Sequence, residues 1–356
     1  MLERPLHQSF KLYCYSGLDG LNVTYVSIFF TLSLLLLSII SLNQFTNLSF
    51  GQQQQQQYVA NSGGLNANVA GSRTTSIHPP APTATGGVDK FGIKELYPTK
   101  SGGGEEWFMN MQDPNHDTQT NPQTTLTKNS DGSYKINSTQ VRYEVFTSSG
   151  YHQDQITTYD QQQLAAKGYM QSPNDWKNVE ITGYFKVNSY TSSIRNGAAH
   201  VELLARGGTH SSPVPCEGTA YHSNTYQTGN SRFEKELEYP QGYTSYYPDQ
   251  ATTSPLQGRG WIGLKAVFYN MPNGSVKLEQ WIDDSTNNIN TPGNNWHKLL
   301  EFTDSGNWGG GHPSCGGTPN TIITWGGPIV HFRWDNIDDM DIKNFSVREI
   351  QPPAVS

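Results

Sequence analysis

Side chains able to do chemistry recur at alternate positions along several segments of this chain. Arg142 and Glu144 lie two residues apart, and so do His200 and Glu202. Side chains at alternate positions of a β-strand point to the same side of the sheet. Further aromatic or charged residues in similar segments are Tyr184, Lys186, Arg206, Lys265, Tyr269, Glu279 and Trp281. Together these residues predict a polar, aromatic sheet face that packs against sugar rings and hydrogen-bonds their hydroxyls.

Four cations in this set also suit an acidic sugar: Arg142, Lys186, Arg206 and Lys265. An ammonium group can pair with a uronate carboxylate, and a guanidinium can do so through two parallel hydrogen bonds. The alternative is that these are solvated faces of amphipathic strands, held by cross-strand ion pairs. The sequence leaves both interpretations open.

Period-two alternation is clearest in the segments 139–147, 178–187, 199–206, 261–270 and 275–283. Alternation of this length is typical of antiparallel strands with one buried face. Asn273-Gly274 between the last two segments predicts a hairpin turn, and 328–335 and 341–350 are expected to form the final strands. The apolar face comprises Val141, Tyr143, Val145, Val179, Ile181, Phe185, Val187, Val201, Leu203, Ile262, Leu264, Ala266, Phe268, Val276, Leu278 and Ile282. The expected fold is an all-β antiparallel jelly-roll sandwich, because no βαβ rhythm is present.

The N-terminal region predicts export. Residues 26–42 form an uncharged apolar run, expected to be helical, and Ser49 and Gly51 precede a possible cleavage point. Residues 1–51 are therefore interpreted as a cleaved signal peptide or an uncleaved membrane anchor. A Gln-, Ser-, Gly- and Pro-rich segment, 52–85, is expected to be a disordered linker. The sandwich domain then spans 86–350 and a short tail 351–356, and the protein is expected to be secreted or held at the cell surface.

Composition narrows the range of partners. The formal net charge is −7, so the chain offers no basic field for nucleic acid. Charged residues make up only 15% of the chain and aromatic residues 12%. A polar, aromatic and weakly charged chain suits an extracellular β-protein that contacts polysaccharide, although Tyr, Trp and Thr are also good strand formers. A membrane is expected as a partner only through the N-terminal segment.

The chain has three cysteines: Cys14, in the export segment, and Cys216 and Cys315, in Gly- and Pro-rich loops. In an oxidising compartment the last two are expected to form one disulfide, with two free thiols as the alternative. Such a bond would close a loop of about 100 residues, which the chain-entropy model values at about 4–5 kcal/mol.

Carboxylates gather near the expected last strands. Asp335, Asp338, Asp339 and Asp341 form a cluster, and Asp89 lies at the start of the domain. Calcium is bound by six to eight oxygen ligands, mostly carboxylates and carbonyls. Asp89, Asp339 and Asp341 are therefore predicted ligands of a structural Ca²⁺, and a solvated acidic turn is the alternative.

Two motifs carry a resemblance to known families. Residues 86–350 consist of strand-like runs separated by Gly, Pro, Asn and Asp clusters, and they end in Phe332-Arg333-Trp334-Asp335 followed by 339–347. This pattern resembles a concanavalin A-like lectin/glucanase jelly roll. Within that superfamily, 141–145 is similar to the Arg-Ser/Thr-Glu-Leu-Arg strand of alginate-lyase-type polysaccharide lyases, with Phe146 in place of the second Arg. Residues 265–270 are similar to the Tyr-Phe-Lys-Ala-Gly-x-Tyr-x-Gln strand, with Tyr269 one position early and Asn270 in place of the Gln.

This resemblance implies a structural calcium near the terminal strands and a lyase mechanism. Arg142 would neutralise the uronate carboxylate, His200 would take the C5 proton, and Tyr269 would protonate the leaving oxygen. The Glu-x-Asp-x-x-Glu strand of jelly-roll glucanases is absent from this sequence, which argues against that type of hydrolase. Three functions remain: polysaccharide binding without turnover, β-elimination of a uronic-acid polymer, and a structural or adhesive surface role.

Overall fold

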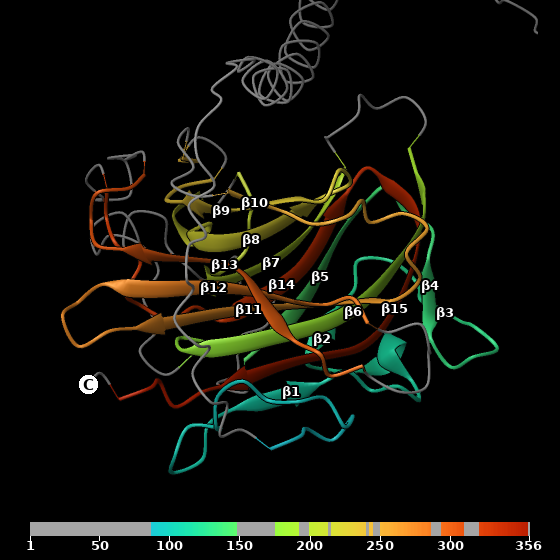
Figure 1. Cartoon of the computed structure of the whole chain (residues 1–356), viewed down its shortest axis with the longest axis horizontal. Helices are drawn as coiled ribbons and strands as arrows, with labels where there is room; N and C mark the ends of the chain where they lie inside the picture. Colours follow the sequence, from blue (N-terminus) through green and yellow to red (C-terminus); the bar gives the residue numbers. More distant parts are fainter. Residues whose placement is uncertain are drawn as a thin grey trace, which may run out of the picture. The chain divides into compact units, whose positions relative to one another are not determined.

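The computed structural model describes residues 87–147, 175–191, 199–212, 215–239, 242–244, 250–285, 293–309 and 320–354. These residues form two antiparallel β-sheets (Figure 1). The predicted export segment, the linker and Cys315 lie outside the described residues. Within those ranges, no helix is long and apolar enough to cross a membrane.

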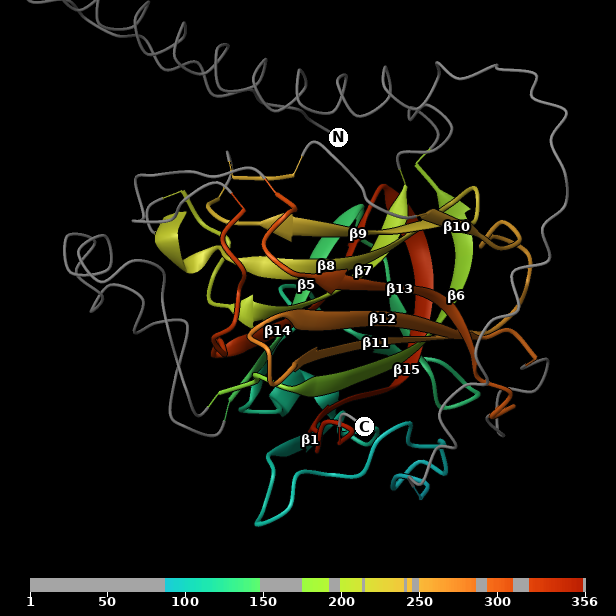
Figure 2. The same cartoon turned by 60° about the vertical axis from the view of Figure 1, so that its left-hand side comes forward.

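The eight-stranded sheet has the strand order β13-β12-β11-β6-β15-β4-β3, and β1 pairs with β15 off this path. Figure 2 shows β13, β12 and β11 side by side. Its strands are β1 (Glu106–Phe108), β3 (Thr127–Lys128), β4 (Tyr134–Ile136), β6 (Val179–Tyr190), β11 (Ile262–Asn270), β12 (Val276–Asp283), β13 (His297–Asp304) and β15 (Ile337–Glu349).

The seven-stranded sheet has the strand order β10-β9-β8-β7-β14-β5-β2. Its strands are β2 (Thr120–Asn121), β5 (Gln140–Phe146), β7 (His200–Gly207), β8 (Ala220–Tyr226), β9 (Asn230–Glu236), β10 (Gln250–Thr252) and β14 (Ile329–Asp335). Two short 3₁₀ helices, η1 (Pro114–His116) and η3 (Pro215–Glu217), lie in the described connections.

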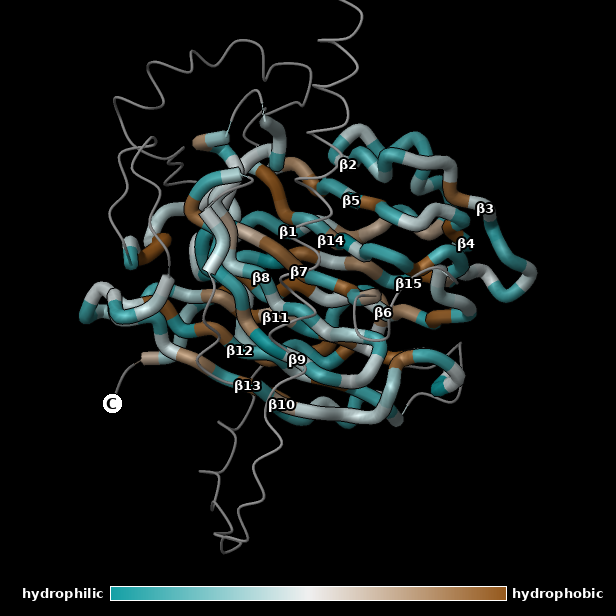
Figure 3. Tube along the Cα trace, turned by 90° about the horizontal axis from the view of Figure 1, so that it is seen from above, coloured by the Kyte–Doolittle hydropathy of each residue, from teal (hydrophilic) through white to brown (hydrophobic). Residues whose placement is uncertain are grey.

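The hydrophobic core lies between the two sheets and contains every residue of the predicted apolar face. Alternation places these side chains inward, and Figure 3 shows hydrophobic residues interspersed with hydrophilic ones along the strands. Phe332 of β14 and Phe345 of β15 stack across the core, with ring centroids 4.1 Å apart. The predicted all-β antiparallel sandwich is therefore confirmed for the described residues.

The predicted hairpin at Asn273-Gly274 is confirmed. Gly274 has a φ of 84°, which a residue without a Cβ adopts easily. The Asn273 side-chain oxygen accepts hydrogen bonds from the Ser275 backbone N–H and hydroxyl, at 3.1 and 2.7 Å. This turn joins β11 to β12 and sets their register, in which Lys265 pairs with Trp281.

The outer face of the eight-stranded sheet is covered by the segment 87–100 rather than open to solvent. Glu180 of β6 accepts hydrogen bonds from the backbone N–H groups of Leu96 and Tyr97, at 3.1 and 3.3 Å to Oε2. The Tyr97 hydroxyl donates to Glu279 Oε2 at 3.0 Å, and Ile93 packs in a cluster with Tyr184. The part of the predicted polar, aromatic face that lies on this sheet is therefore covered, because a segment distant in sequence packs onto it.

Candidate functional site

The outer face of the seven-stranded sheet carries a buried group of imidazoles, carboxylates and guanidinium groups. Alternation along β5, β7 and β14 places these side chains opposite the core-facing Val141, Val201 and Phe332. Strand pairing then brings opposite charges next to one another across the sheet, which stabilises it. The complementary cross-strand pairs are His331 with Glu144, Arg333 with Glu202, and Asp335 with His200, although Arg333 also lies opposite Arg142.

Imidazoles and carboxylates alternate along a chain of contacts across β7, β8 and β9. His200 Nε2 lies 2.5 Å from Glu202 Oε1, and Glu202 Oε2 lies 3.1 Å from His222 Nδ1. On its other side, His222 Nε2 lies 3.3 Å from Glu236 Oε2, and the same oxygen lies 3.1 Å from His210 Nδ1. The side chains of Glu202, His222, Glu236 and His210 are no more than 4% exposed. We call this series the imidazole–carboxylate chain.

Two imidazoles of the imidazole–carboxylate chain differ in charge. Burial opposes protonation of His222, but Glu202 and Glu236 on either side raise its pKa to about 9. Burial and the neighbouring His331 and His222 hold the pKa of His210 well below its ordinary value. At neutral pH His222 is therefore protonated, whereas His210 is neutral and able to accept a proton.

A second group of rings surrounds His210. Its ring centroid lies 5.0 Å from that of His331 and 5.9 Å from that of Tyr239. The Arg142 guanidinium carbon lies 6.0 Å from the centre of the Tyr239 ring. Arg142 and Tyr239 are half-buried, while His210 and His331 are buried. We call Arg142, His210, His331 and Tyr239 the arginine–histidine corner.

His331 is held differently from His210. Its Nε2 lies 3.6 Å from Glu144 Oε1, and Asn121 donates a hydrogen bond to the other oxygen of Glu144, at 2.9 Å. Burial lowers the pKa of His331, and Glu144 offsets this only in part. Both nitrogens of His210 and Nε2 of His331 are buried without a hydrogen-bond partner in the described structure.

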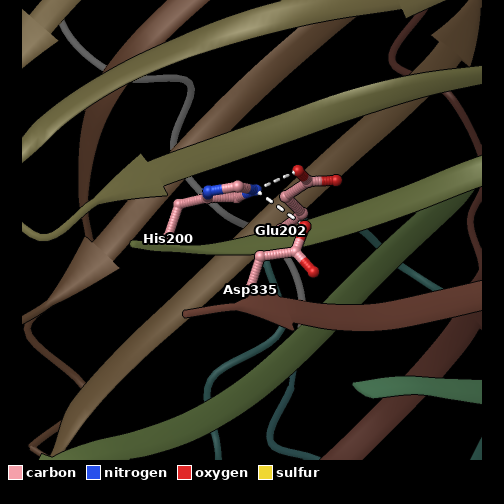
Figure 4. Close-up of side chains that lie close together, drawn as sticks. All are labelled: His200, Glu202 and Asp335. Carbon is pink, nitrogen blue, oxygen red and sulfur yellow. Dashed lines mark hydrogen bonds and ion pairs between the residues drawn. The ribbon is translucent and has the colours of Figure 1, made fainter. Parts of the chain in front are cut away.

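One described group has the donor types and spacing of a metal site. The donor atoms of His200, Glu202 and Asp335 lie within 4.8 Å of one another and converge in Figure 4. An imidazole and two carboxylates suit a divalent metal ion. Arg333 already provides positive charge there, with Nη2 2.6 Å from Asp335 Oδ2 and Nη1 3.4 Å from Glu202 Oε2. The two carboxylates are therefore compensated by this chain's own guanidinium.

The structure separates the three residues predicted to be catalytic. Arg142 and His200 lie on the outer face of the seven-stranded sheet, whereas Tyr269 belongs to β11 of the other sheet. The Tyr269 ring packs near Tyr97 of the covering segment, with centroids 5.8 Å apart. His200 is paired with Glu202 at one end of the imidazole–carboxylate chain. Tyr269 is therefore not positioned to act together with Arg142.

The predicted ligand-binding residues divide in the same way. Glu144 and Glu202 lie beside the site on the seven-stranded sheet. Those on the eight-stranded sheet are Tyr184, Lys186, Lys265, Glu279 and Trp281. Several of the latter bond within the protein: Lys265 donates to Glu180 Oε1 at 2.6 Å, Tyr184 to Asp283, and Trp281 to Glu279.

Arg206 points into the protein instead of onto a strand face. It lies near the end of β7, where pairing with β14 is irregular, and has a φ of 82°. Its Nη1 donates to Asn270 Oδ1 at 2.7 Å and to the Ile323 carbonyl at 2.6 Å. Simple alternation failed here because the irregular pairing turns this side chain toward the other sheet.

The predicted calcium ligands do not form one site. Asp339 and Asp341 lie within β15 rather than in a turn, and both pair with Lys135, at 2.5 and 3.1 Å. Lys186 adds a second ammonium group 3.2 Å from Asp341. Asp89 instead accepts hydrogen bonds from the backbone N–H groups at 91 and 93. Lysine ammonium groups thus neutralise the carboxylates that were expected to bind the ion.

Cys216 lies in η3, is buried, and is disulfide-bonded. Cys315 lies outside the described residues, so the pairing of these two cysteines stays a prediction.

Sequence reasoning did not identify His222, Glu236, Tyr239 or His331, and it noted His210 only as part of a Gly-rich loop, 206–210, that could be catalytic or bind a metal. Alternation along 220–226, which places Tyr221 inward and His222 outward, was a usable signal. So was the alternation of Phe332 and Trp334 with His331 and Arg333 in the expected strand 328–335. His210 lies in the loop that follows β7, and only the folded chain shows what it contacts.

Comparison with known proteins does not show a family for this chain. No family model matches this chain, and no curated protein matches it. Solved structures with a similar arrangement of strands include winged bean acidic lectin in complex with methyl-α-D-galactose, at a TM-score of 0.37 and 8% identity over 70% of this chain and 100% of the lectin. The potassium-bound carbohydrate recognition domain of Emp46p has a TM-score of 0.37 and 7% identity, over 66% of this chain and 90% of that domain.

Alginate lyase Aly36B is also similar in structure, at a TM-score of 0.34 and 10% identity over 70% of this chain and 98% of the lyase. The two-sheet antiparallel sandwich itself follows from this chain's own strand pairing. These similarities concern the arrangement of strands, whereas the chemistry proposed below comes from this chain's own side chains.

Proposed function

We propose that this protein acts outside the cytoplasm on an acidic polysaccharide, and that the arginine–histidine corner cleaves a uronic-acid polymer by β-elimination. The observation that carries the proposal is the neutral, buried His210 next to Tyr239 and Arg142. A base, a phenol and a cation are the three groups that this reaction requires. The extracytoplasmic location rests on the apolar run at 26–42.

Each side chain has a separate role in the proposed reaction. Arg142 pairs with the uronate carboxylate and stabilises the negative charge that develops when the C5 proton leaves. Nε2 of His210 accepts this proton, and Glu236 Oε2 lies 3.1 Å from Nδ1 on the other side of the ring. The Tyr239 hydroxyl protonates the departing O4. The C4–O4 bond breaks, a C4–C5 double bond forms, and no water is consumed.

Binding without turnover is the second candidate function. The observation that favours it is the burial of the imidazoles, since the side chain of His210 is 1% exposed and that of His222 is fully buried. Such side chains would hold the sheet rigid while the half-buried Arg142 and Tyr239 contact the polymer. A rigid platform of this kind lowers the entropy lost on binding.

The test incubates the full chain with neutral and uronic-acid polysaccharides, and measures ultraviolet absorbance of unsaturated product and co-sedimentation with insoluble polymer. Product from one uronate polymer, lost in His210→Ala but retained in His116→Ala, supports the lyase. His116 is the matched control because its side chain is 83% exposed. Co-sedimentation without product supports binding alone. If the protein gives no product and does not co-sediment, both candidate functions are overturned.

A further inference from the structure

Lys235 and Asp304 meet in the interior from opposite sheets. Lys235 belongs to β9 of the seven-stranded sheet, and Asp304 is the last residue of β13 in the eight-stranded sheet. Lys235 Nζ lies 2.8 Å from Asp304 Oδ2, and both side chains are fully buried. The two residues are 69 positions apart in the sequence. This pair lies outside the arginine–histidine corner and has no role in the proposed function.

Burial opposes the positive charge of Lys235, whereas its contacts with an aromatic ring, a carbonyl and a carboxylate favour the ammonium form. Its Nζ lies 5.2 Å from the centre of the Trp308 ring, and it donates a second hydrogen bond to the Thr321 carbonyl, at 2.9 Å. Burial lowers the pKa of Lys235, and Asp304 offsets this only in part. An uncharged amine is a nucleophile, whereas an ammonium group is not.

The surroundings of Asp304 favour attack at its carboxyl carbon. The Tyr221 hydroxyl donates to Oδ2 at 2.7 Å, and the Gly306 backbone N–H donates to Oδ1 at 3.1 Å. The two oxygens are thus distinguished: Oδ1 faces a backbone donor, while Oδ2 lies between a phenol and the amine. A backbone N–H placed in this way stabilises the negative oxygen of a tetrahedral intermediate.

We propose that Lys235 and Asp304 condense into an intramolecular isopeptide bond that joins the two sheets covalently. A proton first passes from Nζ to Oδ2 along their hydrogen bond, which gives a neutral amine and a neutral carboxylic acid. Nζ then attacks Cγ, and negative charge collects on Oδ1 beside the Gly306 N–H. The Cγ–Oδ2 bond breaks with a proton from Tyr221, which regains one from the nitrogen. One water molecule leaves, and no co-reactant is required.

The dry interior favours the product. A buried lysine–aspartate ion pair loses hydration that its mutual attraction repays only in part, whereas an amide carries no charge. Folding also holds the reacting groups together, as in an intramolecular reaction of high effective molarity. The bond would attach β13, an edge strand, to β9, which lies next to the edge strand β10.

The experiment is peptide mass spectrometry on the denatured, reduced and trypsin-digested full chain. The expected result is a branched peptide joining the segments around Lys235 and Asp304, lighter than the two separate peptides by one water, with no cleavage after Lys235. Cleavage after Lys235 together with an unlinked Asp304 peptide would overturn the proposal. Lys265 is the internal control, because it is also buried and paired, with Glu180 at 2.6 Å, but that carboxylate is shared with Arg348.

A variant tests whether bond formation needs the Tyr221 hydroxyl or only the closeness of Lys235 and Asp304. Tyr221→Phe removes the proton donor but retains the ring that packs near Phe268, at 6.0 Å between centroids. We expect the linked fraction shortly after refolding to fall at least tenfold in this variant. An unchanged linked fraction would remove Tyr221 from the mechanism, and the wild-type digest would still decide whether the bond exists.

Discussion

His222 Nδ1 lies 3.1 Å from Glu202 Oε2, although the residues are twenty positions apart and belong to neighbouring strands. The contact places a protonated imidazole against a buried carboxylate, and Glu236 Oε2 lies 3.3 Å from the other ring nitrogen. His222 therefore supplies the positive charge that stabilises two buried carboxylates on this face.

This arrangement predicts a pH-dependent contribution of His222 to stability. Its pKa is raised to about 9 in the folded protein, so folding favours the protonated form. The stabilisation is complete below the unfolded pKa of about 6.5 and is lost as the pH rises through about 9. A shift of this size is worth roughly 3 kcal/mol.

Chemical denaturation of wild type and His222→Gln across this pH range measures the contribution. The difference in unfolding free energy between the two proteins should shrink as the pH rises from about 6 to about 10. A difference that does not change with pH would contradict the assignment of charge to His222.

The proposed lyase activity should persist in mildly acidic solution. Burial and the neighbouring His331 and His222 hold the pKa of His210 well below its ordinary value, so the base stays neutral. The rate kcat/KM on the responsive polymer should therefore not fall as the pH drops from about 8 to about 6.5, the ordinary titration range of histidine. A fall with a midpoint in that range would contradict His210 as the base.

Replacing Tyr239 by Phe should lower kcat on that polymer by about 10²-fold or more, since proton transfer by a positioned group contributes about 10²–10⁴-fold. KM should change little, because the ring that packs near Arg142 remains. Tyr269→Phe is the matched control, since Tyr269 lies on the other sheet. Equal losses in the two variants would indicate a structural effect.

Calcium chelation should leave the melting temperature unchanged. Lys135 and Lys186 lie 3.1 and 3.2 Å from the two oxygens of Asp341. Their ammonium groups therefore occupy the positions beside Asp339 and Asp341 that a calcium ion would need. A ligand that binds only the folded state raises its stability. Scanning calorimetry with calcium and with excess chelator measures the melting temperature in the two conditions. A higher melting temperature with calcium would support the predicted calcium site.

Phe345→Ala should lower the unfolding free energy by about 3–5 kcal/mol, as large-to-small changes of buried aromatic residues do. Phe345 is fully buried and stacks on Phe332 of the opposite sheet, with an interplanar angle of 5°. Urea denaturation measures the change. Lys128→Ala, on the exposed short strand β3, is the control and should cost less than about 0.5 kcal/mol.

The core residues could be predicted from the sequence, because the alternation of apolar and polar residues that identifies them is a local pattern. Val179, Ile181 and Leu264 alternate with polar neighbours, and a strand turns alternate side chains to opposite faces whatever the rest of the chain does. The hairpin at Asn273 followed from two adjacent residues for the same reason. The fold class, the apolar face and the strand containing Arg142 were therefore predictable.

The environment of the outer-face side chains could not be predicted in this way, because packing between distant segments decides whether they are buried or exposed. The segment 87–100 packs over Glu180 and Glu279, so Glu279, which was expected on a ligand-binding face, is a buried hydrogen-bonding group. The same limit applies to the calcium site, where Lys135 reaches Asp339 from a strand about 200 residues away in sequence.

The sequence by itself determined the apolar face of the core, since alternation is a property of each strand alone, and Arg206 departs from that pattern where the strand pairing is irregular. The tertiary structure decided which polar groups meet: strand order placed β8 between β7 and β9, so His222 came to lie between Glu202 and Glu236. It also placed Tyr269 and Arg142 on different sheets and brought Tyr239 toward Arg142 instead. Pairing between distant strands depends on the packing of the whole chain, which no local pattern of residues records.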